Sequence, residues 1–291
     1  MERELSQEAL QAFELVNVKG TKPGSYRVPD FLIIGPQRTG TTWLARHLAL
    51  HEEVFIPAEK ELYYFNYLLE KQGPLYSSDK LSWYLGKFQH SLMDFLRLNA
   101  MNMKMMHGLP RETLNWFRYR RSSVFGEATA SYAAMEHSLV EEVVRLNPEV
   151  KVIMMIRNPV DRAWSHAKKD LVKRTGRKLS DVPFDEFTQF YQHEYQMRCA
   201  MYSDNIAKWR EFIPDEHFFI KRFGDIKSQP NQLFDDICRF IGVMPQAASL
   251  IRQGQVINPT GVPKVPEAHA HFLQGLFADE LQRLSNEYGI E

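Results

Sequence analysis

The residues best suited to chemistry form a loop between a short apolar run and a helix-like segment. Residues 31–34 (FLII) lead into residues 35–43 (GPQRTGTTW). In a strand–loop–helix unit, backbone N–H groups of the loop and of the first helical turn point inward and hold phosphate oxygens. Gly40 permits close approach of the backbone, Arg38 adds a charged fork, and the two threonines after Gly40 add hydroxyl donors. The pattern predicts an anion site.

The position of the basic residue in the loop indicates which kind of anion the loop binds. The loop of nucleoside triphosphatases reads G-x-x-x-x-G-K-[ST], with a lysine for the outer phosphates and a hydroxyl for Mg²⁺. Here Thr41 follows Gly40, and the basic residue is Arg38, inside the loop. A nucleotide with β- and γ-phosphates and Mg²⁺ would lose its main partners. A donor with a single bridging 5′-phosphate and no metal still fits.

A second candidate anion motif lies in the middle of the chain. Residues 151–156 (KVIMMI) read as a strand that ends in Arg157-Asn158-Pro159, and a helix pattern follows. Open α/β sheets bind ligands at the carboxyl edge of their strands, which is where Arg157 stands. Ser165 lies eight residues further on, about two helical turns. The two side chains could therefore converge on one phosphate.

The two motifs together resemble those of the PAPS-dependent sulfotransferase family (PAPS is 3′-phosphoadenosine 5′-phosphosulfate). Residues 36–43 are similar to its 5′-phosphosulfate loop, P-x-[KR]-[ST]-G-T-T-W, and residues 31–42 are especially similar to the heparan-type branch. The resemblance implies that the loop binds the donor and that Arg38 also bears sulfate charge. The residues implied in donor binding are Gln37, Arg38, Thr39, Gly40, Thr41 and Thr42. Trp43 would lie near the adenine, the alternative being a core aromatic.

The same resemblance assigns the other end of the donor. The family's 3′-phosphate motif is an apolar strand, R-[ND]-P, and a serine eight residues after the arginine, which matches Arg157 and Ser165. Tyr202 fits the family's helix tyrosine. A basic, glycine-containing loop usually caps the 3′-phosphate, and residues 258–264 are the candidate, with Lys264 as its cation.

The candidate base is Glu61. Residues 60–65 (KELYYF) resemble the family's K-E-x-x-[FY]-F, whose glutamate is the catalytic base in the heparan-type branch. The acceptor must lose a proton as it attacks sulfur, so the role is chemically sensible. The alternative is a solvated charge in an acidic stretch. The other candidate base is His107. The family's lysine beside the sulfate is here Ala128, so Arg38, Lys60 or another cation must replace its charge.

The elements that position these residues alternate between strands and helices. Short β-like runs occupy residues 31–34, 54–56, 124–125, 152–156 and 217–220. Helical patterns between and after them occupy residues 41–50, 138–146, 160–172, 203–212, 232–241 and 268–288. Such alternation predicts one α/β domain with a central parallel sheet flanked by helices. We expect a helical N-terminal extension over residues 1–28 and a sulfotransferase domain over residues 29–291.

Composition limits the partners. The 291 residues hold 36 Lys plus Arg and 36 Asp plus Glu, so no chain-wide attraction to nucleic acid is indicated. Two cysteines are too few for a disulfide scaffold, and no apolar stretch is long enough for a membrane span. With no signal peptide in the first residues, we expect a cytoplasmic protein. Its acceptor would be a glycan or small molecule, by hydroxyl or amine. The alternatives are a Mg-dependent P-loop kinase or NTPase and a non-catalytic nucleotide-binding protein of the same fold.

Overall fold

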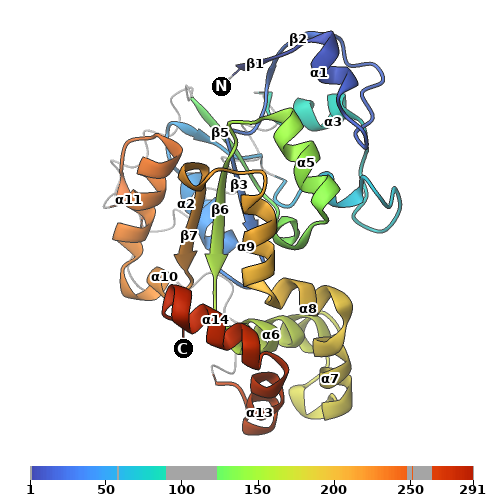
Figure 1. Ribbon diagram of the computed structural model, residues 1–291. Coiled ribbons are helices and arrows are strands. Elements are labelled where there is room, and N and C mark those ends of the chain that lie inside the picture. Colours follow the sequence, from blue (N-terminus) through green and yellow to red (C-terminus); the bar gives the residue numbers. More distant parts are fainter. Residues whose placement is uncertain (1, 58, 90–122, 248–250, 252–263, 291) are drawn as a thin grey trace.

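The computed structural model describes residues 2–57, 59–89, 123–247, 251 and 264–290. In this part of the chain the central sheet has five strands in the order β4-β5-β3-β6-β7, and every pairing is parallel. The predicted α/β fold with a central parallel sheet flanked by helices is therefore confirmed (Figure 1). The strands are β3 (Phe31–Gly35), β4 (Val54–Phe55), β5 (Val124–Ala128), β6 (Lys151–Ile156) and β7 (Phe218–Arg222).

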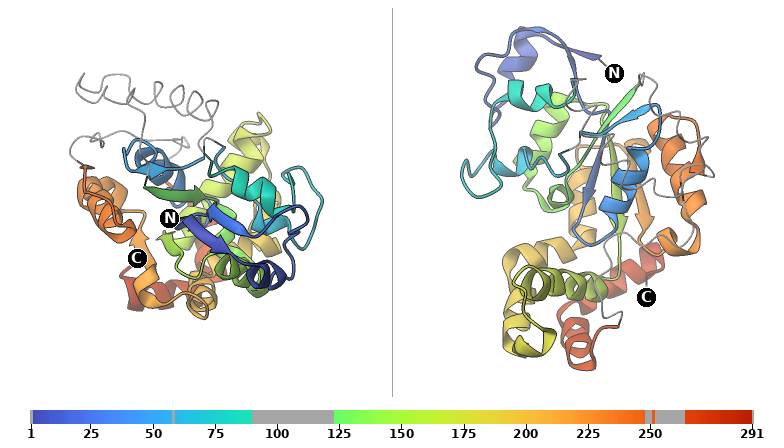
Figure 2. Two further views of the ribbon diagram at one scale, coloured as in Figure 1. Left: turned by 90° about the horizontal axis from the view of Figure 1, so that it is seen from above. Right: turned by 180° about the vertical axis from the view of Figure 1, so that it is seen from behind.

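Alternate residues of the strands belong to two hydrophobic clusters, one on each face of the sheet. In β3, Leu32 and Ile34 join one cluster, and Phe31 and Ile33 join the other, because successive side chains of a strand point to opposite faces. The first cluster is covered by α3 (Leu81–Gly86), α5 (His137–Leu146) and α9 (Tyr202–Arg210). The second is covered by α2 (Thr41–Leu48) and α11 (Pro230–Ile241), which lie together on that face (Figure 2, right). A short α10 (Asp225–Ser228) precedes α11.

A third cluster closes the carboxyl end of the sheet. The chain leaves β6 and enters α6 (Pro159–Ala167), which continues as a π-helical stretch (Lys168–Lys173). α7 (Phe184–Gln192), α8 (Glu194–Ala200) and α13 (Glu267–Leu276) pack with α6 below the sheet in Figure 1. α14 (Ala278–Tyr288) follows α13, so the single helix predicted over residues 268–288 is in fact two helices.

The N-terminal segment differs from the helical extension predicted for residues 1–28. Its helix is confined to α1 (Gln7–Gln11), between the antiparallel strands β1 (Glu2–Leu5) and β2 (Gly24–Arg27). The N–H groups of residues 14, 15 and 16 donate to the buried carboxylate of Glu142 on α5, at 3.0–3.3 Å. Because this carboxylate satisfies them, the chain need not stay helical there. Leu5 and Leu10 are buried in the same cluster as Leu32, so the segment belongs to the main core.

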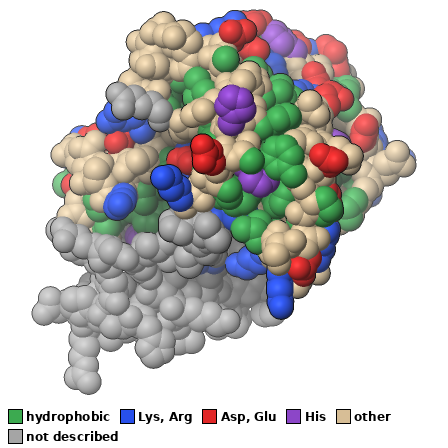
Figure 3. Space-filling model, turned by 90° about the horizontal axis from the view of Figure 1, so that it is seen from below, with side chains coloured by type: hydrophobic (Ala, Val, Ile, Leu, Met, Phe, Trp, Pro, Cys, Tyr) green, Lys and Arg blue, Asp and Glu red, His purple; other side chains and the backbone are tan. Residues whose placement is uncertain are grey.

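One face of the described surface agrees with the balanced composition. Seen from below, from the end where the third cluster lies, acidic and basic side chains are interspersed with apolar ones (Figure 3). Among the described helices, none combines the length and the apolar character that crossing a bilayer would need.

Candidate active site

Two glycines in left-handed conformations shape the loop between β3 and α2. Gly35 has a φ of 99° and Gly40 a φ of 92°. A Cβ on Gly35 would lie 2.0 Å from the carbonyl oxygen of Ala130, and one on Gly40 would lie 2.3 Å from Cδ1 of Ile226. At Gly35 a larger residue would clash with backbone. At Gly40 the nearest atom is the flexible end of Ile226, and it is the left-handed φ that favours glycine. Gly40 is also the N-cap of α2 and has no side chain to bond the N–H groups of the first turn. These groups are left to bind an anion.

The side chains of the loop divide into two sets. Thr39 is fully buried, and its hydroxyl donates to the carbonyl oxygen of Pro36 at 2.7 Å, so its side chain holds the loop together rather than facing a ligand. The side chains that line the adjoining cavity are those of Gln37, Arg38, Thr41 and Thr42. The side chain of Gln37 is held in place by a hydrogen bond in which its amide nitrogen donates to the hydroxyl of Tyr195.

The two predicted anion motifs meet at Arg38. Its Nε donates to Oγ of Ser165 at 3.0 Å, and its carbonyl oxygen accepts from Nη1 of Arg157 at 3.1 Å. The contact arises because β3 and β6 are neighbours in the sheet, so the segments that follow their carboxyl ends lie side by side. The sequence predicted that Arg157 and Ser165 converge; the structure adds that Arg38 lies between them.

The electrostatics of this junction are those of a site for negative charge. Burial, and then the charge of Arg157, hold the pKa of Arg38 below its usual value. Burial also lowers the pKa of Arg157. Lys168, the first residue of the π-helical stretch, is 7% exposed, and its pKa is lowered by burial and by the charges of both arginines. Nε of Arg157 is buried without a hydrogen-bond partner in the described part of the chain. An anion would relieve all of these costs.

Glu61 lies in the segment after β4, beside the loop. Its backbone N–H donates to the carbonyl oxygen of Ala128 at 3.1 Å. Oε1 accepts from Nζ of Lys60 at 2.8 Å, and Oε2 accepts from the hydroxyl of Tyr63. Burial alone would raise the pKa of Glu61, but the charge of Lys60 and the two hydrogen bonds outweigh it and leave the pKa below its ordinary value. With a side chain only 23% exposed, Glu61 is a fixed, ionised carboxylate rather than a solvated surface charge.

Arg38 and Glu61 line the same cavity, which has a volume of about 600 Å³. Its walls come from the β3–α2 loop, the segment of residues 60–67, the start of the 3₁₀ turn after β5, and the outer end of α6 with its π-helical continuation. The lining residues beyond those already named are Asn66, Tyr67, Leu75, Ala130, Ser131, His166, Lys169, Asp170 and Arg174. An anion-binding wall and an ionised carboxylate thus face the same space, as a group transfer with proton abstraction requires.

Sequence reasoning missed Lys168 beside the arginines, Lys169 and Asp170, which line the cavity, and two tyrosines. Lys168 comes three residues after Ser165, so helical spacing from a residue already chosen was a usable signal for it. Tyr63 stands two residues from Glu61, but nothing in the local pattern shows that its hydroxyl returns to the carboxylate. Tyr195 comes from α8, which only the folded chain brings to the loop.

Two residues assigned to the donor site lie deeper than the resemblance implied. Trp43 is 5% exposed and packs in the cluster between α2 and α11, with its ring centroid 4.4 Å from that of His47. It is a core aromatic and does not line the cavity. Tyr202 is fully buried at the start of α9, and burial raises its pKa against the charges of Arg162 and Arg157.

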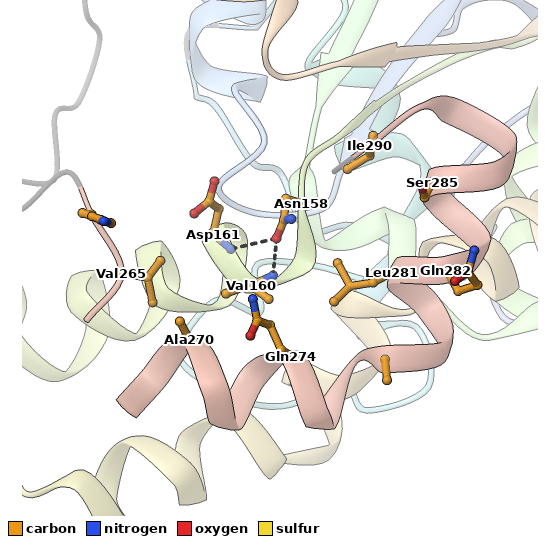
Figure 4. Close-up of a pocket in the computed structure, with 12 residues that line it drawn as sticks. Asn158, Val160, Asp161, Val265, Ala270, Gln274, Leu281, Gln282, Ser285 and Ile290 are labelled. Atoms are coloured by element: carbon orange, nitrogen blue, oxygen red, sulfur yellow. Dashed lines mark hydrogen bonds between the residues drawn. The ribbon is translucent and has the colours of Figure 1, made fainter. Parts of the chain in front are cut away.

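Lys264 lines a second cavity rather than the first. This space, of about 660 Å³, lies between the start of α6 and the helices α13 and α14 (Figure 4). Asn158, the residue after Arg157, caps α6 there by accepting from the N–H groups of Val160 and Asp161. Lys264 thus shares a cavity with Asn158, the residue after Arg157, and does not line the cavity of Arg38. The candidate base His107 and residues 258–263 lie outside the described residues.

The comparison with family models agrees with this geometry. The model of the sulfotransferase family matches residues 29–246, well over half of the chain. The chain therefore belongs to the sulfotransferase family, and the resemblance predicted from its motifs is confirmed.

Individual relatives agree with the predicted branch and fold. The bifunctional heparan sulfate N-deacetylase/N-sulfotransferase 2 of Bos taurus is 24% identical over 276 residues, which are 90% of this chain and 26% of the relative. The Homo sapiens enzyme of the same name is 25% identical over 232 residues, 75% of this chain and 22% of the relative. The chain thus spans about a quarter of the length of these curated relatives.

Two solved structures show the fold at low sequence identity. A sulfotransferase from Alicyclobacillus acidocaldarius superimposes with a TM-score of 0.58 at 20% identity, covering 91% of this chain and 97% of the other. The mouse sulfotransferase SULT7A1 complexed with PAP superimposes with a TM-score of 0.50 at 14% identity, covering 97% and 94%. The predicted sulfotransferase-like fold is confirmed.

Proposed function

We propose that this protein transfers the sulfuryl group of PAPS to a hydroxyl or amine acceptor by in-line displacement and releases 3′,5′-ADP. The observation that carries the proposal is the meeting of the two anion motifs. Nε of Arg38 donates to Ser165, and Nη1 of Arg157 donates to the carbonyl oxygen of Arg38. Nε of Arg157 is buried without a partner in the described part of the chain, and burial and the charge of Arg157 both lower the pKa of Arg38. Buried like charges are costly unless an anion accompanies them. A Mg-dependent kinase or NTPase would need a lysine where this chain has Thr41.

The residues present fit the two anionic ends of PAPS. The free N–H groups at the start of α2, with Thr41 and Thr42, would hold the 5′-phosphosulfate. Arg157 and Lys168 would hold the 3′-phosphate, and the buried Nε of Arg157 is a donor still available for an anion oxygen. The mouse relative of the same fold, complexed with PAP, supports this choice of nucleotide.

In the proposed reaction, Glu61 on one side of the cavity accepts a proton, and Arg38 on the other side stabilises negative charge. Glu61 accepts the proton of the acceptor while a bond forms from the acceptor oxygen or nitrogen to sulfur. The bond from sulfur to the bridging oxygen breaks, and its electron pair stays on the 5′-phosphate. Arg38 and the N–H groups of α2 stabilise that charge, which is the largest that develops in the transfer. Glu61 is ionised at neutral pH, and its lowered pKa makes it a weaker base than an ordinary glutamate, so its contribution comes from its fixed position beside the acceptor.

In this proposal the donor's phosphosulfate lies on the Arg38 side of the cavity of about 600 Å³, and the acceptor binds on the Glu61 side. The names of the curated relatives support a glycan acceptor. The tyrosines and the polar residues of the lining also suit a small molecule.

Thermal-shift titration tests the donor. PAPS and 3′,5′-ADP should raise the unfolding midpoint, because a ligand that binds the folded state alone stabilises it. Mg·ATP should have a much smaller effect. Stabilisation by Mg·ATP without stabilisation by 3′,5′-ADP would overturn the proposal. A panel of phenol, alcohol, amine and glycan acceptors with ³⁵S-labelled PAPS then tests turnover. Donor binding without transfer to any of them would favour a non-catalytic nucleotide-binding protein.

A further inference from the structure

The backbone around Glu61 has an uncommon local geometry. Glu61 and Tyr63 both adopt left-handed conformations, with φ of 67° and 53°, which residues other than glycine rarely do. The residues that alternate with them are anchored in the core: Leu62 is 3% exposed and Tyr64 is 2% exposed. Two polar side chains are thereby turned to the cavity and two apolar ones to the core. Strained conformations of this kind persist where the surrounding packing enforces them.

Tyr63 is joined to the candidate base through its hydroxyl. That hydroxyl donates to Oε2 of Glu61, while Nζ of Lys60 holds Oε1. Burial, followed by the negative charge of Glu61, raises the pKa of the Tyr63 phenol. The phenol therefore stays protonated at neutral pH and remains a donor to the ionised Glu61. Each carboxylate oxygen can accept a second hydrogen bond, so room is left for the acceptor.

We propose that Tyr63 is a positioning residue for Glu61. The hydroxyl of Tyr63 orients the Glu61 carboxylate toward the acceptor and stabilises the ionised form of that carboxylate. The inference rests on the proposed role of Glu61 as base. Two fixed partners on one carboxylate leave its orientation settled before the acceptor arrives, and such preorganisation removes a cost from the transfer step.

The test removes only the hydroxyl. Tyr63→Phe keeps the ring, and Tyr67→Phe is the matched control, since the Tyr67 ring lines the same cavity 6.4 Å from that of Tyr63. The Glu61 carboxyl is followed by ¹³C NMR during a pH titration and assigned with Glu61→Gln. Loss of a hydrogen bond to the charged form raises the pKa of the carboxyl. The Glu61 titration should therefore move to higher pH by about one unit in Tyr63→Phe and stay in place in Tyr67→Phe. Equal titrations in the two variants would overturn the proposal.

A second substitution guards against a folding defect. A fluorinated tyrosine at position 63 has nearly the same size but donates a stronger hydrogen bond. It should move the Glu61 titration in the opposite direction, to lower pH. No movement, or movement to higher pH, would also count against the proposal.

Enzyme kinetics distinguish a positioning role of Tyr63 from a role in packing alone. With ³⁵S-labelled PAPS and the best acceptor of the panel, Tyr63→Phe should lower kcat by about tenfold and shift the acidic limb of the pH profile upward, with KM for PAPS unchanged. A proportionate rise in KM for PAPS with no shift of the limb would show a merely structural role. If PAPS fails to stabilise wild type, the proposed function fails, whereas the NMR titration still decides the contact between Tyr63 and Glu61.

Discussion

Replacing Arg157 by alanine probes the 3′-phosphate end of the proposed donor site. The change removes a guanidinium that donates to the carbonyl oxygen of Arg38 at 3.1 Å and lies 4.4 Å from the ring centroid of Phe223. It also removes the one buried N–H of that guanidinium that has no partner in the described part of the chain. If that group binds the 3′-phosphate, ligand affinity should fall far more than stability.

The magnitude follows from two opposed effects. Two unit charges about 4 Å apart attract by roughly 4 kcal/mol at an effective dielectric constant of about 20. Part of this attraction is offset, because the phosphate loses hydration when it enters the buried site. The net loss for PAPS should be about 2–4 kcal/mol, the range seen when one partner of a buried charge pair is truncated. This corresponds to a Kd about 30- to 900-fold higher.

The assay compares two ligands in three proteins by isothermal titration calorimetry. Adenosine 5′-phosphosulfate lacks the 3′-phosphate, so Arg157→Ala should hardly change its affinity, and the preference for PAPS should collapse. Arg222→Ala is the control, because Arg222 ends the neighbouring strand β7 with a side chain 50% exposed and paired with Asp225. It should leave both affinities unchanged.

Parallel losses for the two ligands would refute the reasoning. They would mean that Arg157 supports the loop rather than the phosphate, and a clear drop in the unfolding midpoint of the ligand-free protein should accompany them. In the proposed role that midpoint changes little, since relief of repulsion offsets the lost bond to Arg38.

Three further predictions concern the loop, the base and the metal. Glu61→Gln should lower kcat by about 10²–10⁴-fold with PAPS affinity nearly unchanged; a near-normal kcat would shift attention to His107. Gly40→Ala, which places a residue with a Cβ at a φ of 92°, should weaken the thermal stabilisation by PAPS, and full retention would contradict the assigned loop geometry. Activity should survive EDTA, because Arg38 and backbone N–H groups hold the donor; loss on chelation with recovery on adding Mg²⁺ would count against a sulfotransferase.

The parts of the fold and site that could be predicted are those encoded locally. Short apolar runs such as residues 152–156 marked the strands because a parallel strand is buried on both faces. The anion motifs were readable for a similar reason: Gly40, Arg38 and Arg157 stand within a few residues of a strand end. The sheet then brings two such ends together without further information, which is why the motifs meet.

What could not be predicted depends on contacts between distant segments. The non-helical course of residues 14–16 is set by Glu142, more than a hundred residues away. The core position of Trp43 depends on the packing of α11 against α2. The expectation of a cytoplasmic protein stays a prediction, as do the roles of Tyr202 and Lys264 toward the donor.

The alanine at position 128 shows how the fold can supply charge that the local sequence lacks. Where the resemblance implies a lysine, Ala128 is buried, and its carbonyl oxygen only anchors the N–H of Glu61. Positive charge reaches the site instead from the π-helical stretch after α6. Lys168 lies with the buried arginines, and Lys169 lines the cavity and lowers the pKa of Glu61. In the proposed function, Lys168 would serve the donor and Lys169 the acceptor, so the π-helical continuation of α6 would supply the charge that Ala128 lacks.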